Sequence, residues 1–537
     1  MTSANESERW AFSRQHYGLA GIFFLAAAAL WLATFSTDRF VDRDAYDYAQ
    51  IGRQIERGEG FTTLQTFPRH ISYMEQQGML EGPWPSLLRY PVSPALNALA
   101  QTVITDPVTA ATVQTGVCFL LSVPLLFLLA ARVTNLLLAS LATLLYVGDP
   151  RIWRDSANGM TESVALLILL AVLNLASLPA VQEGKRSTWV ALGLLSGLAY
   201  LTRTQLIVLV PLGLAWILFT VRRPVRLRTA VFFLASALLA VSPWLIRNAR
   251  VTGDPTFAFT NSRNLLAHTE SYTGIDRYLH EPTDVAVVID RYGHEILAKI
   301  GRHLWPNVVD PRFWFEAVGV YTLAIPLFLL GVALHRRYPL KRPAFLVFER
   351  TTLLLLLANF FLVCLIYHRQ RYYDTMIPLL IIVLVQRLVW LMDGILPAAR
   401  RWQQGVLLVL LALSVGRLGH TLNEHAAAPG VPEADRQTYA RLDQLIADDR
   451  VVLSDLSGQV TLYNGNRTVR TPANPREILE IDADYLTIDY VLISQRFMRP
   501  AYEVFLASPE FLERFEPSAS LPNGALLFRK VAVVSGL

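Results

Sequence analysis

Long apolar segments alternate with short polar ones along most of the chain. Eleven of them approach the length of about 20 residues that an α-helix needs to cross a bilayer. They lie near residues 17–37, 108–131, 133–149, 160–180, 188–202, 204–221, 229–246, 316–334, 351–367, 376–393 and 404–420. This pattern predicts a multi-pass α-helical membrane protein with about 11 transmembrane helices.

Basic residues are concentrated in alternate connections between these segments, at 183–186, 222–228, 335–342 and 399–401. Because short cytoplasmic loops carry an excess of Lys and Arg, we expect the N-terminus inside and the C-terminus outside. Four segments then face outward: 38–107, 149–162, 247–315 and 368–375. The first apolar segment lacks a small-x-small cleavage site, so we expect it to be retained as an anchor.

The pattern changes after residue 420. Short apolar triplets, as in RVVLSD and DYVLIS, alternate with helical stretches, and the end of the chain resembles a hairpin around Pro522-Asn523-Gly524. We therefore expect a transmembrane domain over 1–420 and a small extracytoplasmic α/β domain over 421–537.

Composition supports a membrane protein. Of the 537 residues, 53% are hydrophobic and 17% are charged, whereas soluble domains carry about 25% charge. The net charge of +5 is modest and its basic residues lie in loops, so no nucleic-acid partner is implied. Cys118 and Cys364 lie inside apolar segments and predict small core residues.

Three carboxylates, Asp42, Asp44 and Asp47, follow the first apolar segment directly. Acidic groups at such a border carry a desolvation cost unless they are hydrated, paired or functional. Asp44 could instead be the N-cap of a helix from Ala45 to Arg57, which Gly58 would terminate. Both interpretations stay open from the residues alone.

Other charged residues fall on the same outer side: Glu162, Arg203, Arg247 and Arg371. A carboxylate can deprotonate an acceptor hydroxyl, and arginines can hold a departing phosphate through bidentate hydrogen bonds. Simpler roles exist, because Glu162 could cap a helix after Thr161, Arg203 could snorkel to headgroups and Arg247 could anchor a helix exit. Tyr46, Tyr48 and Trp84 could likewise stack on a sugar or belong to the aromatic belt.

Several segments carry a family resemblance in their order. They are DAYDYAQIGRQIERGEGF (44–61), RYPVSPAL (89–96), TESVALLILL (161–170), GLLSGLAYLTRTQLIVLVP (193–211), SPWLIRNARVTGDP (242–255) and RQRYYDTMIPLL (369–380). Over about 30–425 the chain resembles the GT-C superfamily of polyprenyl-phosphate-sugar-dependent glycosyltransferases. It looks closest to bacterial relatives of protein O-mannosyltransferases and of the lipid A aminoarabinose transferase.

The resemblance implies roles for individual residues. Asp44 matches the catalytic base of the first outer loop, and Glu162 matches an acidic residue of the second. Ala45 departs from the common Asp-Glu pair, which leaves open whether Asp47 takes the second role, since positions three apart share a helix face. The implied donor-phosphate residues are Arg203, Arg247 and Arg371, and the implied substrate-binding residues are Tyr46, Tyr48, Arg89 and Tyr372.

The implied function is a glycosyltransferase of the bacterial cytoplasmic (inner) membrane. It would move a sugar from an undecaprenyl-type polyprenyl phosphate to a lipid, glycan or protein acceptor at the outer face. Some superfamily members use a divalent metal, but the acidic residues here are sparse, and we predict no metal and no cofactor.

Three other functions compete with this one. A transporter or flippase for lipid-linked sugars would need charged residues deep within spans and a repeat between halves, and neither is visible. A membrane glycan polymerase or ligase stays open because the segment 247–315 carries arginines and histidines. A receptor that senses through 421–537 has the least support.

Overall fold

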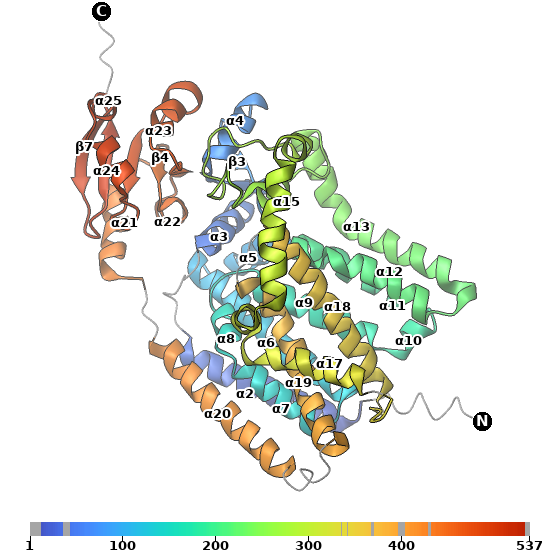
Figure 1. Ribbon diagram of the computed structural model, residues 1–537. Coiled ribbons are helices and arrows are strands. Elements are labelled where there is room, and N and C mark those ends of the chain that lie inside the picture. The colour runs from blue at the N-terminus through green and yellow to red at the C-terminus, as the bar shows by residue number, and fades with distance from the viewer. Residues whose placement is uncertain are drawn as a thin grey trace, which may run out of the picture.

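The computed structural model describes residues 12–35, 43–334, 336–340, 342–366, 370–395, 403–427 and 431–531. A helical bundle is joined to a smaller domain built on a sheet (Figure 1). Asp42 and the basic residues 399–401 lie outside the described part of the chain.

A helix occupies each of the eleven apolar segments. These helices are α2 (Arg14–Thr34), α6 (Pro107–Val133), α7 (Leu136–Val147), α9 (Glu162–Ala176), α11 (Arg186–Thr202), α12 (Leu209–Thr220), α13 (Arg226–Thr252), α17 (Ala324–Ala333), α18 (Pro343–Ile366), α19 (Ile377–Trp390) and α20 (Gln403–Ala427). Within the described residues, six helices are long and apolar enough to cross a membrane alone. The multi-pass class is therefore supported, whereas the count of eleven spans stays a prediction.

Close helix contacts in the bundle depend on small residues. Gly193 and Gly197 of α11 face α13, and a Cβ at Gly197 would lie 2.7 Å from the carbonyl oxygen of Ala237. Glycines four positions apart allow two helix backbones to approach closely, which favours helix association in membranes. The hairpin that carries Arg203 at the end of α11 is thereby held in place.

The outer segments fold over one end of the bundle. The first contains α3 (Arg43–Glu56), α4 (Pro68–Gln76), α5 (Val92–Gln101) and the antiparallel pair β1 (Thr62–Thr63) and β3 (Trp84–Pro85). The second contains α8 (Pro150–Asp155), and the third contains α14 (Phe259–Leu266), α15 (Val285–Val309) and α16 (Pro311–Val318). The fourth is the 3-10 helix η4 (Gln370–Met376).

The start of α3 differs from the capping interpretation. This helix begins at Arg43, so Asp44 lies inside its first turn and not at the residue before it. Its carboxylate is therefore available for partners beyond the helix end. The predicted end is close to the observed one, since α3 stops at Glu56 and Gly58 has a φ of +84°, a conformation that favours glycine.

The C-terminal domain is a mixed α/β unit, as its pattern predicted. Its strands are β4 (Val451–Ser454), β5 (Arg467–Arg470), β6 (Tyr490–Ile493), β7 (Phe515–Ser520) and β8 (Leu526–Lys530), and its main helices are α21 (Glu433–Leu445), α22 (Ser457–Asn464) and α24 (Pro500–Leu506). The hairpin predicted around Pro522-Asn523-Gly524 joins the antiparallel strands β7 and β8.

One strand of this sheet comes from the other end of the chain. The order is β2-β5-β4-β6-β8-β7, and the edge strand β2 (Gln65–Thr66) belongs to the first outer segment. It pairs in parallel with β5, and the backbone N–H of Thr468 donates to the carbonyl of Leu64 at 2.7 Å. Ile71 and Met74 of α4 also pack into the core beneath the sheet. The first outer segment and the C-terminal domain are therefore one folded unit (Figure 1).

Candidate active site

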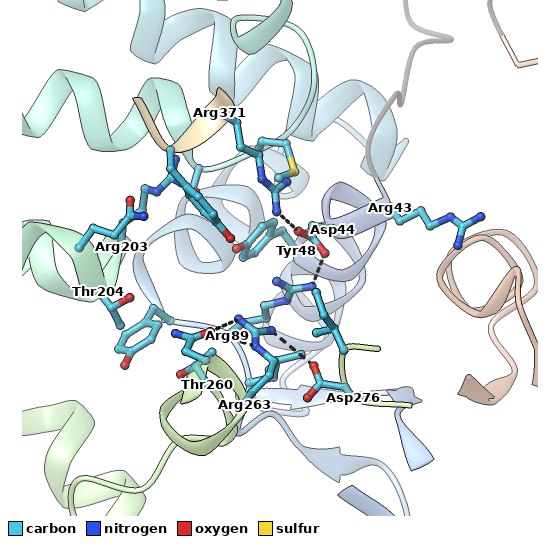
Figure 2. Close-up of a pocket in the computed structure, with 18 of the residues that line it drawn as sticks. Arg43, Asp44, Tyr48, Arg89, Arg203, Thr204, Thr260, Arg263, Asp276 and Arg371 are labelled. Carbon is cyan, nitrogen blue, oxygen red and sulfur yellow. Dashed lines mark hydrogen bonds and ion pairs between the residues drawn. The ribbon is translucent and has the colours of Figure 1, made fainter. Parts of the chain in front are cut away.

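A cavity of 570 Å³ lies where the outer segments, the membrane helices and the C-terminal sheet meet. Arginines and carboxylates that are far apart in sequence line it. In Figure 2 Arg89 and Arg371 point toward Asp44, whereas the side chain of Arg43 extends away from them. The charged lining residues are Arg43, Asp44, Arg89, Glu162, Arg203, Arg263, Asp276, Arg277, Arg371 and Arg470. Seven guanidinium groups face three carboxylates, an excess of four positive charges that favours an anionic ligand.

Asp44 receives one arginine on each carboxylate oxygen. Nη2 of Arg89 lies 2.8 Å from Oδ1, and Nη2 of Arg371 lies 2.8 Å from Oδ2 (Figure 2). Burial acts to raise the pKa of Asp44, but the charges of Arg89 and Arg371 outweigh it and hold that pKa well below its usual range. The side chain keeps 27% exposure toward the cavity, so the ionised carboxylate is accessible to a ligand.

Asp47 lies one turn further along α3 and shares the same arginine. Nε of Arg89 lies 2.5 Å from its Oδ2, and the amide of Gln50 donates to its Oδ1 at 3.0 Å. The side chain is 5% exposed and does not border the large cavity. Asp44 and Asp47 therefore share a helix face, as their spacing predicted, but Asp47 supports Arg89 from behind.

Glu162 and Arg203 form a buried pair on the membrane side of the cavity. Nη1 of Arg203 lies 2.9 Å from Oε1 of Glu162, whose side chain is 4% exposed. The side chain of the preceding Thr161 makes no capping bond, and Glu162 is itself the first residue of α9. A buried carboxylate needs such a partner, because an uncompensated charge is costly in the interior.

Two tyrosines contact the guanidinium groups of arginines in the cavity. The ring of Tyr372 lies 5.7 Å from the guanidinium carbon of Arg203 and 5.8 Å from that of Arg371. The ring of Tyr48 lies 4.9 Å from the guanidinium carbon of Arg89. Cation–π contacts of this kind order guanidinium groups without neutralising them. Both tyrosines line the cavity, and their role in substrate binding stays a prediction.

Two expected site residues lie away from this cavity. Nη2 of Arg247 donates to the carbonyl of Phe61 at 3.0 Å, and its guanidinium stacks over the ring of Trp244 at 5.0 Å. Tyr46 is buried, and its ring packs against the ring of Tyr463 in α22 at 6.2 Å. Both positions join parts of the fold, which is neither the predicted site role nor the interface role that the sequence left open for them.

Several lining residues were missed by sequence reasoning, namely Arg43, Arg263, His268, Asp276, Arg277 and Arg470. Four of them come from the third outer segment, whose richness in Arg and His was the only available signal. His268 and Asp276 have φ values of 63° and 54°, strained conformations that often mark ligand sites. Arg470 ends β5 and reaches the cavity only because β5 pairs with β2.

Two carboxylates of the cavity are paired with arginines. Asp44 contacts the guanidinium groups of Arg89 and Arg371, and Glu162 contacts that of Arg203. Across the described parts of the chain, no group of three or more His, Cys, Asp and Glu side chains is placed to hold a metal. Asp42 lies outside those parts, and the absence of a metal stays a prediction.

Comparison with known proteins agrees with this architecture. Residues 85–246 match the family model described as dolichyl-phosphate-mannose-protein mannosyltransferase. That segment carries Arg89, Glu162 and Arg203. A search of curated proteins finds no match.

Solved structures share the fold over nearly the whole chain. ArnT from Cupriavidus metallidurans, bound to undecaprenyl phosphate, matches with a TM-score of 0.60 and 12% identity over 97% of this chain and 99% of that chain. Its apo structure gives a TM-score of 0.59 with the same identity and coverage. The Archaeoglobus fulgidus oligosaccharyltransferase, in complex with Zn and sulfate, gives 0.53 at 12% identity over 95% and 73%. Part of the membrane domain, residues 85–246, is thus similar to this mannosyltransferase family, and the chain as a whole has the fold of ArnT and of the oligosaccharyltransferase.

Proposed function

We propose that the chain transfers a sugar from an undecaprenyl-type polyprenyl phosphate to a lipid, glycan or protein acceptor. The reaction takes place at the outer face of the bacterial cytoplasmic membrane. The observation that carries this proposal is the placement of Asp44 between Arg89 and Arg371 in a cavity that Arg203 also lines. A general base and phosphate-binding groups thereby line the same cavity.

The donor class is supported by position and by the comparisons. Arg203 follows the end of α11, and Arg371 begins a candidate membrane span. A phosphate at this level is reached by a carrier whose polyprenyl tail stays among the helices. ArnT, which has the same fold, binds undecaprenyl phosphate. Phosphate recognition suits arginine, because its planar fork donates two parallel hydrogen bonds to adjacent oxygens.

The chemical step follows from these groups. Asp44 takes the proton of an acceptor hydroxyl, and the oxygen attacks the anomeric carbon of the sugar. The bond from that carbon to the phosphate oxygen breaks, and the phosphate leaves with the electron pair. The guanidinium groups of Arg89, Arg203 and Arg371 stabilise the charge that develops on the leaving group. One in-line displacement of this kind inverts the configuration at the anomeric carbon.

Donor binding also raises the pKa of the base, Asp44. In the empty cavity Arg371 holds Asp44 ionised but weakly basic, because its charge lowers the carboxyl pKa. A donor phosphate competes for the same guanidinium. Once Arg371 turns to the phosphate, less positive charge acts on Asp44 and its pKa rises toward the range of an effective base. Proton abstraction is therefore favoured only when donor is present.

The test is the Asp44→Asn variant, assayed for sugar transfer from a polyprenyl-phosphate donor in detergent. We expect transfer to fall about 100- to 10,000-fold, the usual contribution of a general base, while the protein still folds. Glu59→Gln is the matched control, since Glu59 is an exposed acidic residue of the same outer segment. Transfer at the wild-type rate by folded Asp44→Asn protein would remove Asp44 from this role.

A membrane glycan polymerase or ligase is a second candidate. It is favoured by the third outer segment, which places Arg263, His268 and Arg277 in the same cavity. The same experiment separates the two. A polymerase whose chemistry depends on this segment would retain activity in Asp44→Asn and lose it in His268→Ala.

A further inference from the structure

The cavity holds more guanidinium groups than one phosphate can use. Arg89, Arg203 and Arg371 are balanced in part by Asp44 and Glu162 and suffice for the donor phosphate. Arg43, Arg263, Arg277 and Arg470 remain. Asp276, a carboxylate of the cavity lining, already pairs with Arg263 at 3.5 Å and with Arg69 at 3.4 Å. The arginines on the side of the C-terminal domain therefore outnumber the carboxylates available to balance their charge.

Arg470 is the clearest member of this group. Among the residues that the structure describes, no carboxylate lies within ion-pair distance of its guanidinium. Its guanidinium lies over the ring of Phe67, with 5.5 Å between the guanidinium carbon and the ring centroid. An aromatic face orients a guanidinium while leaving its five N–H donors for a ligand.

Arg43 and Arg277 complete the group from two other segments. Arg43, the first residue of α3, is exposed and forms no ion pair within the described ranges. Arg277 donates to the carbonyl of Thr471, the residue after Arg470, at 3.2 Å. That bond fixes Arg277 beside the end of β5. Three chain segments thus bring three arginines to one wall of the cavity.

Holding these arginines together costs free energy when no anion is present. Burial is the main cause that lowers the pKa of Arg470 to about 10, and the charges of Arg43 and Arg277 lower it further. Arg277 is perturbed in the same direction, by burial and by neighbouring arginines that include Arg43. Asp44 and Asp276 act on Arg470 in the opposite direction, but they do not outweigh burial and the neighbouring arginines. Like charges that are held together without a direct ion pair favour an anionic ligand.

We infer that Arg43, Arg277 and Arg470 form a second anion site, which binds an acidic group of the sugar acceptor. This inference rests on the proposed function, because that function assigns the other arginines to the donor phosphate. The acidic group is a phosphate or a carboxylate that the acceptor carries near the hydroxyl that is glycosylated.

The position of the group assigns it to the acceptor and not to the donor. Arg470 comes from the C-terminal sheet and Arg43 from the outer segment, whereas Arg203 and Arg371 adjoin membrane helices. A donor tethered by its tail presents its phosphate to the membrane side. Asp44 and Arg470 line the same cavity, so an anion bound at Arg470 lies in the same cavity as the base that activates the hydroxyl.

The binding test uses inorganic phosphate as the probe on the full chain in detergent. Line broadening in the ³¹P NMR spectrum reports weak binding without any turnover. We expect the Arg43→Gln/Arg470→Gln variant to lose at least half of the broadening. Arg371→Gln should also reduce the broadening, because it removes phosphate binding at the donor site instead. Arg467→Gln is the control, because Arg467 lies on the same strand but stacks over Trp84, outside the cavity lining.

Acetate distinguishes the two acidic groups. Competition by millimolar acetate for the Arg43/Arg470-dependent broadening indicates a carboxylate-tolerant site, and resistance to it indicates a phosphate site. Broadening in Arg43→Gln/Arg470→Gln equal to that of Arg467→Gln would overturn the site. This binding arm stands even if no transfer from a polyprenyl donor is detected, so the two proposals fail separately.

The kinetic test separates acceptor from donor. We expect Arg470→Gln to raise the KM for the acceptor at least tenfold and to leave the KM for the donor within twofold. Arg470→Lys, which keeps the charge, should restore part of the acceptor affinity. A rise in the donor KM with an unchanged acceptor KM would assign the arginines to the donor and overturn the inference.

Discussion

Asp44 bonds to two arginines, and this arrangement sets the protonation behaviour of the site. Burial alone would raise its pKa, whereas Arg89 and Arg371 lower it to well below the usual range. In the free enzyme the carboxylate is thus ionised throughout the neutral and mildly acidic range. A base of this kind gives no acidic limb in the pH dependence of kcat/KM near its ordinary pKa of about 4.

Replacing one of the two arginines should introduce an acidic limb into the pH dependence of kcat/KM. In Arg371→Gln one of the two charges that lower the Asp44 pKa is gone, while burial still raises it, so we expect the pKa to move upward. The activity of the variant should fall as pH decreases through this higher pKa, at a pH where wild-type kcat/KM is flat. The measurement is a pH profile of kcat/KM for both proteins.

Arg57→Gln provides the matched control for that profile, since Arg57 is an exposed arginine just after the same helix. Its profile should match the wild type. An Arg371→Gln profile with a wild-type shape, merely scaled down, would show that Arg371 does not govern the protonation of Asp44.

The sequence predicted the central residues of the site better than its outer wall. Asp44, Glu162, Arg203 and Arg371 were identifiable because each is a charge at the border of an apolar segment. Arg247 occupies a similar border, yet it donates to a backbone carbonyl away from the cavity. Border position alone does not specify where a long side chain points, so this difference could not be derived from sequence.

At the scale of elements, the pairing of β2 with β5 connects the site to the C-terminal domain. Each strand is short, and β2 has two residues, too few for an alternating pattern to be recognised. The helices, in contrast, were predicted from long apolar runs, and one lies in each expected range. Apolar length reports burial in lipid, whereas a two-residue strand depends on a partner about 400 positions away.

A disulfide can test this pairing. Thr66 and Val469 are direct partners across β2 and β5, and adjacent strands lie at a spacing that a disulfide can bridge. We expect Thr66→Cys/Val469→Cys to form a cross-link under mild oxidation, detected as a mobility shift on a non-reducing gel. The native Cys118 and Cys364 are buried and should not react.

The control pair for the cross-link is Thr66→Cys/Val452→Cys. Val452 belongs to β4, which is one strand further from β2 in the sheet. No shift is expected for this pair. Cross-linking of both pairs, or of neither, would mean that the first outer segment does not add an edge strand to this sheet.

At the scale of the whole molecule, the basic connections and the cavity lie on opposite sides of the helical bundle. The basic connections after α12 and after α17 lie on the side of the bundle opposite the C-terminal sheet (Figure 1). The cavity lies on the side of the sheet, where β5 and the outer segments meet. Because basic loops stay in the cytoplasm, this arrangement supports an extracytoplasmic site.

Reporter fusions can test this orientation. Alkaline phosphatase folds only outside the cytoplasm, so we expect a fusion after Val531 to be active and a fusion at Arg223 to be inactive. Green fluorescent protein at the same two positions should give the reverse result. Active phosphatase at Arg223 would invert the topology and place Asp44 on the cytoplasmic side.

The strand shared between the two ends of the chain has a consequence for biosynthesis. The ribosome makes β2 early, but its partner β5 and the neighbouring Arg470 follow some 400 residues later. Until translation is nearly finished, the cavity lacks the wall that carries Arg470. Prematurely terminated products would therefore insert into the bilayer without becoming competent for turnover.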